Sequence, residues 1–139
     1  MITVVVLVII GLLIISVIVI AALEKGPSTA DLALAYEHAW DALDFETIWA
    51  LSALELRDGL DRRQFAKAKR AAYAGVDHPT DLVATATVSD IAESGDVAAA
   101  ITELVLRDGS TVHHEVLMGR RMGRWEVTGY TLRPEDAPA

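Results

Sequence analysis

The sequence predicts an α+β domain behind an N-terminal transmembrane helix, and three observations indicate this. Residues 2–23 contain no charged side chain, and 17 of these 22 residues are Ile, Val or Leu. Between residues 29 and 74, apolar residues recur at the spacing of helices. Beyond residue 80 the apolar period changes to two, with turn residues between the runs. Three helices followed by a four-stranded antiparallel meander predict helices packed on one face of a sheet.

The first segment has the length of a membrane span. A helix of 22 residues is about 33 Å long, and the hydrocarbon core of a bilayer is about 30 Å thick. A cleaved signal peptide is the alternative, but it needs a basic start and a shorter apolar run. We therefore predict a single-pass membrane protein whose partner is the lipid bilayer, through residues 2–23. The single basic residue close to this segment, Lys25, favours a cytoplasmic domain.

Composition divides the chain and excludes some functions. We predict an anchor and linker over 1–27, an α+β domain over 28–134 and a disordered tail over 135–139. The formal net charge of −8 argues against a nucleic-acid partner. The chain has no cysteine, and its four histidines lack the spacing of metal ligands. We therefore predict no metal, and the absence of phosphate-loop and hydrolase motifs predicts no cofactor.

Three polar residues predict the starts of three helices. Ser28, Asp44 and Asp61 each have the character of an N-cap, and Asp61 is followed at the third position by Gln64, as in a capping box. The expected helices cover 29–43, a shorter segment from 45, and 61–74. In the first, one side is apolar (Leu32, Ala35, Tyr36, Ala39, Trp40 and Leu43), and the other side is expected to hold Asp31, Glu37, His38 and Asp41.

Four strands are expected over 82–92, 96–107, 110–119 and 124–132. Ser94-Gly95-Asp96, Asp108-Gly109 and Met122-Gly123 separate them. Of these turns, Asp108-Gly109 is the strongest hairpin signal.

Two stretches resemble a known family. Residues 35–45, Ala-Tyr-Glu-His-Ala-Trp-Asp-Ala-Leu-Asp-Phe, resemble the opening helix and acidic-aromatic turn of the NTF2-like (cystatin-like, ketosteroid-isomerase-like) superfamily. Residues 123–127, Gly-Arg-Trp-Glu-Val, resemble its closing strand. The resemblance covers about 28–134 and implies a membrane-anchored bacterial member in which a curved sheet wraps helices into a cone with an apolar cavity. No acid–base pair matches the enzymes of the superfamily, so no catalytic residue carries over.

Aromatic residues and one histidine are the candidates for a pocket. His114 shares a strand face with Val112 and Val116, and it could act as a general base beside a carboxylate such as Asp41 or Glu103. The alternative is a packed histidine whose nitrogens are satisfied. Rings supply apolar walls with polar edges, although they also fill cores. The candidate pocket residues are Tyr36, Trp40, Tyr73, His114, Trp125 and Tyr130.

Half of the basic residues gather between Arg57 and Arg70. The expected basic surface consists of Arg62, Arg63, Lys67 and Arg70, with a solvated helix face as the alternative. The leading hypothesis is a membrane-tethered accessory domain that binds a small apolar ligand or a protein partner, including a homodimer through the sheet. One alternative is an isomerase or hydratase using His114, and another is a module that binds anionic lipid through the basic surface.

Overall fold

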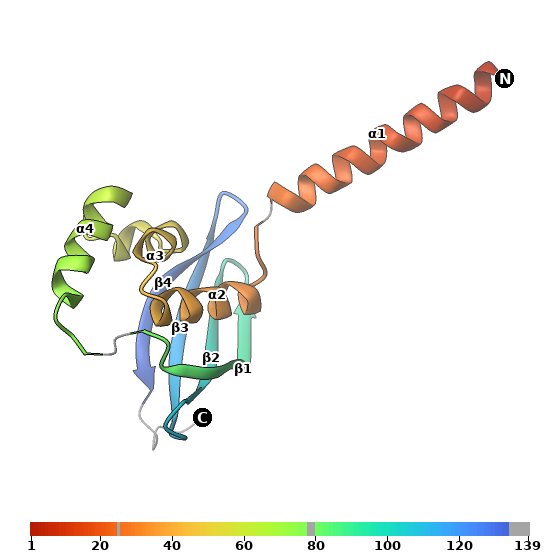
Figure 1. The fold of residues 1–139 in the computed structure, drawn as a ribbon. Helices are drawn as coiled ribbons and strands as arrows, with labels where there is room; N and C mark the ends of the chain where they lie inside the picture. Colours follow the sequence, from red (N-terminus) through yellow and green to blue (C-terminus); the bar gives the residue numbers. More distant parts are fainter. Residues whose placement is uncertain (25, 78–79, 134–139) are drawn as a thin grey trace.

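The computed structural model is an α+β structure in which the described residues form four α-helices and one four-stranded antiparallel sheet, as predicted (Figure 1). It describes residues 1–24, 26–77 and 80–133, with the backbone alone for 18–24. The helices are α1 (Ile2–Glu24), α2 (Thr29–Asp41), α3 (Phe45–Leu51) and α4 (Arg62–Tyr73), and a 3-10 turn, η1, covers Leu54–Leu56. The predicted tail over 135–139 lies outside the described residues.

The sheet is a meander. Its strands are β1 (Val83–Ser94), β2 (Val97–Leu106), β3 (Thr111–Arg121) and β4 (Arg124–Arg133), hydrogen-bonded in that order. Each strand begins and ends within two residues of its predicted limits, because the turns between them have recognisable chemistry. At the β2–β3 turn, Gly109 has a φ of 90°, a conformation that favours glycine.

The three predicted N-caps explain where the helices begin. The side chain of Ser28 accepts a hydrogen bond from the backbone N–H of Asp31, and Asp44 accepts one from Thr47. Asp61 and Gln64 form a complete capping box at the start of α4. These caps satisfy backbone donors that lack partners inside a helix.

The transmembrane prediction is corrected. Among the helices of the described residues, none combines the length and the hydropathy of a membrane span. The predicted span over 2–23, the single-pass membrane localisation and the cytoplasmic side inferred from Lys25 are therefore not retained. Figure 1 shows α1 projecting away from the other elements.

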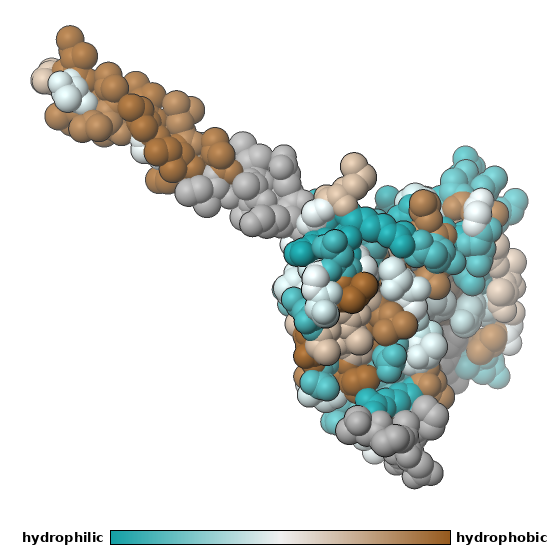
Figure 2. All heavy atoms as spheres, turned by 180° about the vertical axis from the view of Figure 1, so that it is seen from behind, coloured by the Kyte–Doolittle hydropathy of each residue, from teal (hydrophilic) through white to brown (hydrophobic). Residues whose placement is uncertain are grey.

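The core lies between the helices and one face of the sheet. Leu32 of α2 and Phe45 and Ile48 of α3 are at most 2% exposed. Facing them on the sheet are small or medium side chains, which let α2 approach the strands closely: Ala98, Ala100, Val116, Met118 and Val127. From behind, Figure 2 shows apolar atoms in the middle of the domain surface with hydrophilic atoms around them. The predicted protein partner or homodimer through the sheet stays a prediction.

A β-bulge in β4 changes the direction of its side chains. Met118 pairs with Val127 and Leu117 pairs with Gly129, so Thr128 is an extra residue in β4. In a regular strand, Val127 and Tyr130 would point to opposite faces because they are three residues apart. The extra residue places both on the helix side. The bulge therefore brings Tyr130 under α2.

Candidate functional site

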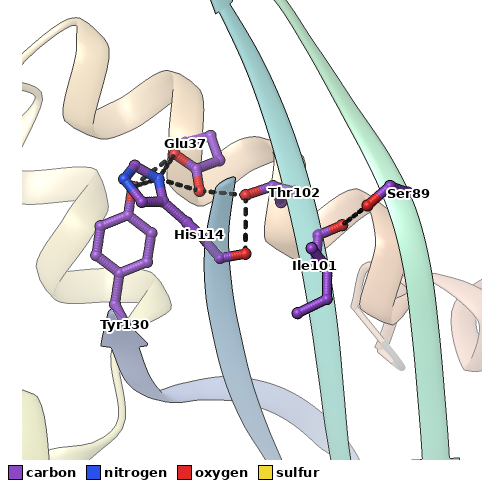
Figure 3. Close-up of polar contacts among 6 residues, drawn as sticks. All are labelled: Glu37, Ser89, Ile101, Thr102, His114 and Tyr130. Atoms are coloured by element: carbon purple, nitrogen blue, oxygen red, sulfur yellow. Dashed lines mark hydrogen bonds and ion pairs between the residues drawn. The ribbon is translucent and has the colours of Figure 1, made fainter. Parts of the chain in front are cut away.

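Three neighbouring strands each present one polar side chain to the same point on α2. Thr102 of β2 lies directly opposite His114 of β3. Tyr130 of β4 lies opposite Val116, and therefore diagonally beside His114 on the same face. All three side chains meet the carboxylate of Glu37, which comes from α2 (Figure 3). We call these four residues the Glu37 cluster.

Glu37 is a buried carboxylate, with 2% of its surface exposed. Its Oε1 accepts a hydrogen bond from Thr102 Oγ1 at 2.7 Å, and its Oε2 accepts one from the Tyr130 hydroxyl at 2.5 Å. His114 Nδ1 is 3.0 Å from both oxygens. A buried charge is costly unless donors surround it, so three donors explain how this carboxylate is accommodated.

The His114 ring faces two environments. A carboxylate can only accept hydrogen bonds, so the contact with Glu37 places a proton on Nδ1. The Tyr130 hydroxyl also lies 2.8 Å from Nδ1. Nε2 makes no hydrogen bond to any residue that the structure describes, and the side chain is 18% exposed. In the neutral ring, Nε2 is therefore an open acceptor whose orientation is fixed by Glu37.

Aromatic rings surround the Tyr130 side of the Glu37 cluster. Trp40 is parallel to Tyr130, with ring centroids 6.3 Å apart, and Tyr36 meets Tyr130 edge to face at 5.1 Å. Burial raises the pKa of Tyr130 above its ordinary value, and the negative charge of Glu37 raises it further. Burial also raises the pKa of Tyr36, whose hydroxyl lies 3.0 Å from Ser52 Oγ. Both phenols are therefore held in the neutral form.

A cavity of about 180 Å³ lies beside the Glu37 cluster. His114, Glu37, Tyr130, Trp40 and Asp41 line one part of it. The other lining residues are all aliphatic: Leu82, Val83, Leu104, Leu106 and Val112. An apolar space with a few convergent polar atoms is the usual form of a small-molecule site. A second cavity of about 240 Å³ shares Trp40 and Tyr130 with the first.

The structure brings together four of the six predicted pocket residues: Tyr36, Trp40, His114 and Tyr130. The other two, Tyr73 and Trp125, do not line the cavity beside His114. Tyr73 packs against Trp40 and Phe45, with ring centroids 6.2 and 5.7 Å away. The Trp125 ring stacks with the guanidinium of Arg120, whose Cζ atom lies 5.2 Å from the ring centroid.

The carboxylate beside His114 is neither of the two that the sequence suggested. Asp41 accepts hydrogen bonds from the backbone N–H groups of Leu82 and Val83, and so holds the start of β1, although it also lines the cavity. Glu103 pairs with His113, at 3.2 Å on the other sheet face. Glu37 was expected on the polar side of its helix. The signal for it was weak: Glu37 follows Tyr36 and lies one turn from Ala33 and from Trp40 of the apolar side.

The basic side chains of α4 point to solvent. Arg62, Arg63 and Lys67 are exposed, and Arg70 pairs with Glu46 of α3. The Arg70 guanidinium holds the pKa of Glu46 below its usual value. Across the described residues, no group of three or more His, Cys, Asp or Glu side chains could hold a metal ion.

The fold and the site define a small α+β domain with a buried Glu–His–Tyr cluster beside a cavity. No family model matches the sequence, and no curated protein is similar to it at a significant level. A SEC-C motif-containing protein from Rhodopseudomonas palustris has a similar solution structure, with a TM-score of 0.53 and 20% identity over 74% of this chain and 77% of that chain. A crystal structure from Kribbella flavida DSM 17836, described as a protein of known function, has a TM-score of 0.44 and 21% identity over 76% of this chain and 88% of that chain.

These comparisons correct the family prediction. At 20% identity the likeness to the Rhodopseudomonas palustris protein shows the fold alone. The Rhodopseudomonas palustris structure is not described as an NTF2-like protein, and none of the described helices has the length and hydropathy of a membrane span, so the predicted membrane-anchored NTF2-like membership is not retained. The stretches 35–45 and 123–127 that suggested it encode an amphipathic helix, an acidic cap and a strand. Unrelated α+β domains need the same features.

Proposed function

We propose that this domain binds a small, largely apolar ligand in the cavity beside His114. The observation that supports the proposal is the combination of aliphatic walls with the open Nε2 of His114, held by Glu37. The stacked rings of Trp40 and Tyr130 add flat apolar surface on one side. Such a site supplies burial for most of the ligand and one polar contact that sets its orientation.

Filling the cavity is expected to weaken binding strongly. Val112 lines the cavity and is only partly buried, so Val112→Phe adds a ring at a position that can accommodate it. We expect binding of benzene, toluene and cyclohexanol to weaken about tenfold or more, because a drug-like or smaller ligand needs most of its surface buried. Saturation-transfer NMR with the full chain measures this.

Val105→Phe is the matched control for the cavity test. Leu104 pairs with Val112, and the next residue of β2, Val105, pairs with Thr111. Neighbouring residues of a strand point to opposite faces, so the Val105 side chain points away from the face that carries Leu104 and Val112. The same substitution there leaves binding unchanged. If none of the three compounds binds the unmodified chain, or if both variants behave alike, the proposal fails.

A second candidate function is proton transfer, and the His114–Glu37 contact favours it. In this proposal Nε2 removes a proton from a C–H or O–H group of the ligand, and Glu37 stabilises the imidazolium that forms. The ring returns the same proton to a neighbouring ligand atom in an isomerisation, or to a departing hydroxide in a dehydration. Glu37 is the positioning residue, because it touches the ring and not the ligand.

The proton-transfer candidate predicts base-catalysed exchange. Cyclohexanone in D2O exchanges its α-protons when a base removes them, and NMR follows the loss of the α-proton signal. The protein's contribution is the exchange rate with protein minus the rate in buffer alone. We expect His114→Gln to lower this contribution by about 100-fold or more, the range for loss of a general base. His113→Gln, on the opposite face of the same strand, is the control. Equal rates in the two variants would exclude His114 as the base.

A further inference from the structure

The described residues that line the cavity beside His114 include two acidic side chains and no basic side chain other than His114 itself. Among its described lining residues, Glu37 and Asp41 carry carboxylates, and none is a lysine or an arginine. A negative ligand in this space would approach two like charges with no cation to offset them. At an effective dielectric constant of about 20, two unit charges about 6 Å apart repel by roughly 3 kcal/mol. An anionic ligand is therefore disfavoured.

Two lining residues of the cavity carry a ring nitrogen without a hydrogen-bond partner among the described residues: the donor Nε1 of Trp40 and the acceptor Nε2 of His114. Both oxygens of Glu37 already receive hydrogen bonds from within the Glu37 cluster. Asp41 Oδ1 receives two backbone N–H groups. Besides the second oxygen of Asp41, His114 Nε2 is the acceptor on a lining residue that has no partner among the described residues. A ligand satisfies it by offering a donor.

The cavity has about the volume that a single ring fills. Its volume is about 180 Å³, and an apolar protein cavity of about 150 Å³ binds benzene. A six-membered ring with one substituent therefore fits. The aliphatic side chains on the remaining walls match such a ring.

Resting on the proposed function, we infer that the ligand class is an uncharged single-ring alcohol or phenol, whose hydroxyl donates to His114 Nε2, and that carboxylates are rejected. The two acidic side chains select against the anion, and the open acceptor selects for the donor. The proton that Nε2 receives in this hydrogen bond is the one that it would remove in the second candidate function.

Phenol, benzene and benzoate test this inference, because they share a ring and differ in donor and charge. Titrations of the full chain at pH 7, followed by NMR shifts of the His114 ring and of Val112, give the three dissociation constants. We expect phenol to bind about 2- to 10-fold more tightly than benzene, the value of one hydrogen bond to an open acceptor. Benzoate is expected to bind at least about tenfold more weakly than phenol.

His114→Phe tests the contribution of the hydrogen bond separately from that of the shape of the cavity. It replaces one ring by another without the acceptor, so phenol should lose its advantage over benzene, while His113→Phe should preserve it. If benzoate binds the unmodified chain as tightly as phenol does, the inference is overturned and the proposed ligand site still stands. This comparison uses the unmodified chain alone, so it does not depend on whether a variant folds. An advantage of phenol that persists in folded His114→Phe also overturns it. If none of the three compounds shifts the His114 and Val112 signals, both proposals fall.

Discussion

Replacing Glu37 by leucine is expected to lower the free energy of unfolding by about 3–5 kcal/mol. Thr102, His114 and Tyr130 each lose the acceptor of a hydrogen bond, and a buried donor without a partner costs about 1–3 kcal/mol. The Thr102 hydroxyl can turn towards the His114 carbonyl oxygen, 3.5 Å away, so the total stays below the sum. Urea denaturation followed by circular dichroism at pH 7 measures the loss, which is a large share of the 5–15 kcal/mol typical of a domain.

Glu103→Gln is the matched control, because it changes the other Glu–His contact of the same sheet. The side chains of Glu103 and His113 are 42% and 34% exposed, and an exposed pair contributes only about 0–1 kcal/mol. The combined variant of Glu37→Leu with Thr102→Val and Tyr130→Phe tests the mechanism. Since it removes donors together with their acceptor, we expect it to recover part of the loss. A loss below about 1 kcal/mol in Glu37→Leu would show that the donors find other partners.

Local signals predicted the elements of the fold well. Asp61 and Gln64 form the capping box that their spacing indicated, and the strand limits follow the glycine-containing turns. These features depend on residues within four positions of one another. For the same reason, short motifs such as 123–127 gave a family assignment that the comparisons do not support.

The central residue of the site could not be predicted from local pattern. A glutamate beside an apolar helical stripe usually points to solvent, and Glu37 was assigned there. It is buried because its three donors arrive from strands 65, 77 and 93 residues further along the chain. Burial of the carboxylate is thus chiefly a property of the assembled sheet, and the residues within one turn of Glu37 on α2 give only a weak signal for it.

The bulge in β4 is a second non-local feature. Strict alternation from Val127 would turn Tyr130 away from the helices, and the extra residue Thr128 reverses this. The sequence named Tyr130 as a pocket candidate for its residue type alone. Its place in the Glu37 cluster depends on a register shift that the sequence pattern of β4 does not indicate.

Raising the pH above about 10 is expected to destabilise the domain steeply, through Tyr36 and Tyr130. The folded-state pKa of each phenol is raised, chiefly by burial, whereas an unfolded tyrosine has a pKa of about 10. Below pH 10 both states keep the protons, and the contribution to stability is complete. Above pH 10 the unfolded chain releases protons that the folded chain retains, so stability falls, for each tyrosine by about 1.4 kcal/mol per pH unit until its folded-state pKa is reached.

The prediction for high pH is tested by how steeply the free energy of unfolding falls with pH. Its absolute value is not a suitable test, because removing either hydroxyl also removes a hydrogen bond. We expect Tyr130→Phe to reduce the decline of unfolding free energy between pH 10.5 and 11.5 by about 1.4 kcal/mol, and Tyr36→Phe to reduce the same decline by an equal or smaller amount. In a Tyr73→Phe background, all tyrosinate absorbance at 295 nm (about the tyrosinate maximum) comes from these two residues, and it should appear together with the loss of circular dichroism. Tyrosinate that forms while the circular dichroism is still that of the folded chain would contradict the prediction. In that case the folded and unfolded chains release these protons at the same pH, and the two tyrosines would not make the free energy of unfolding depend on pH.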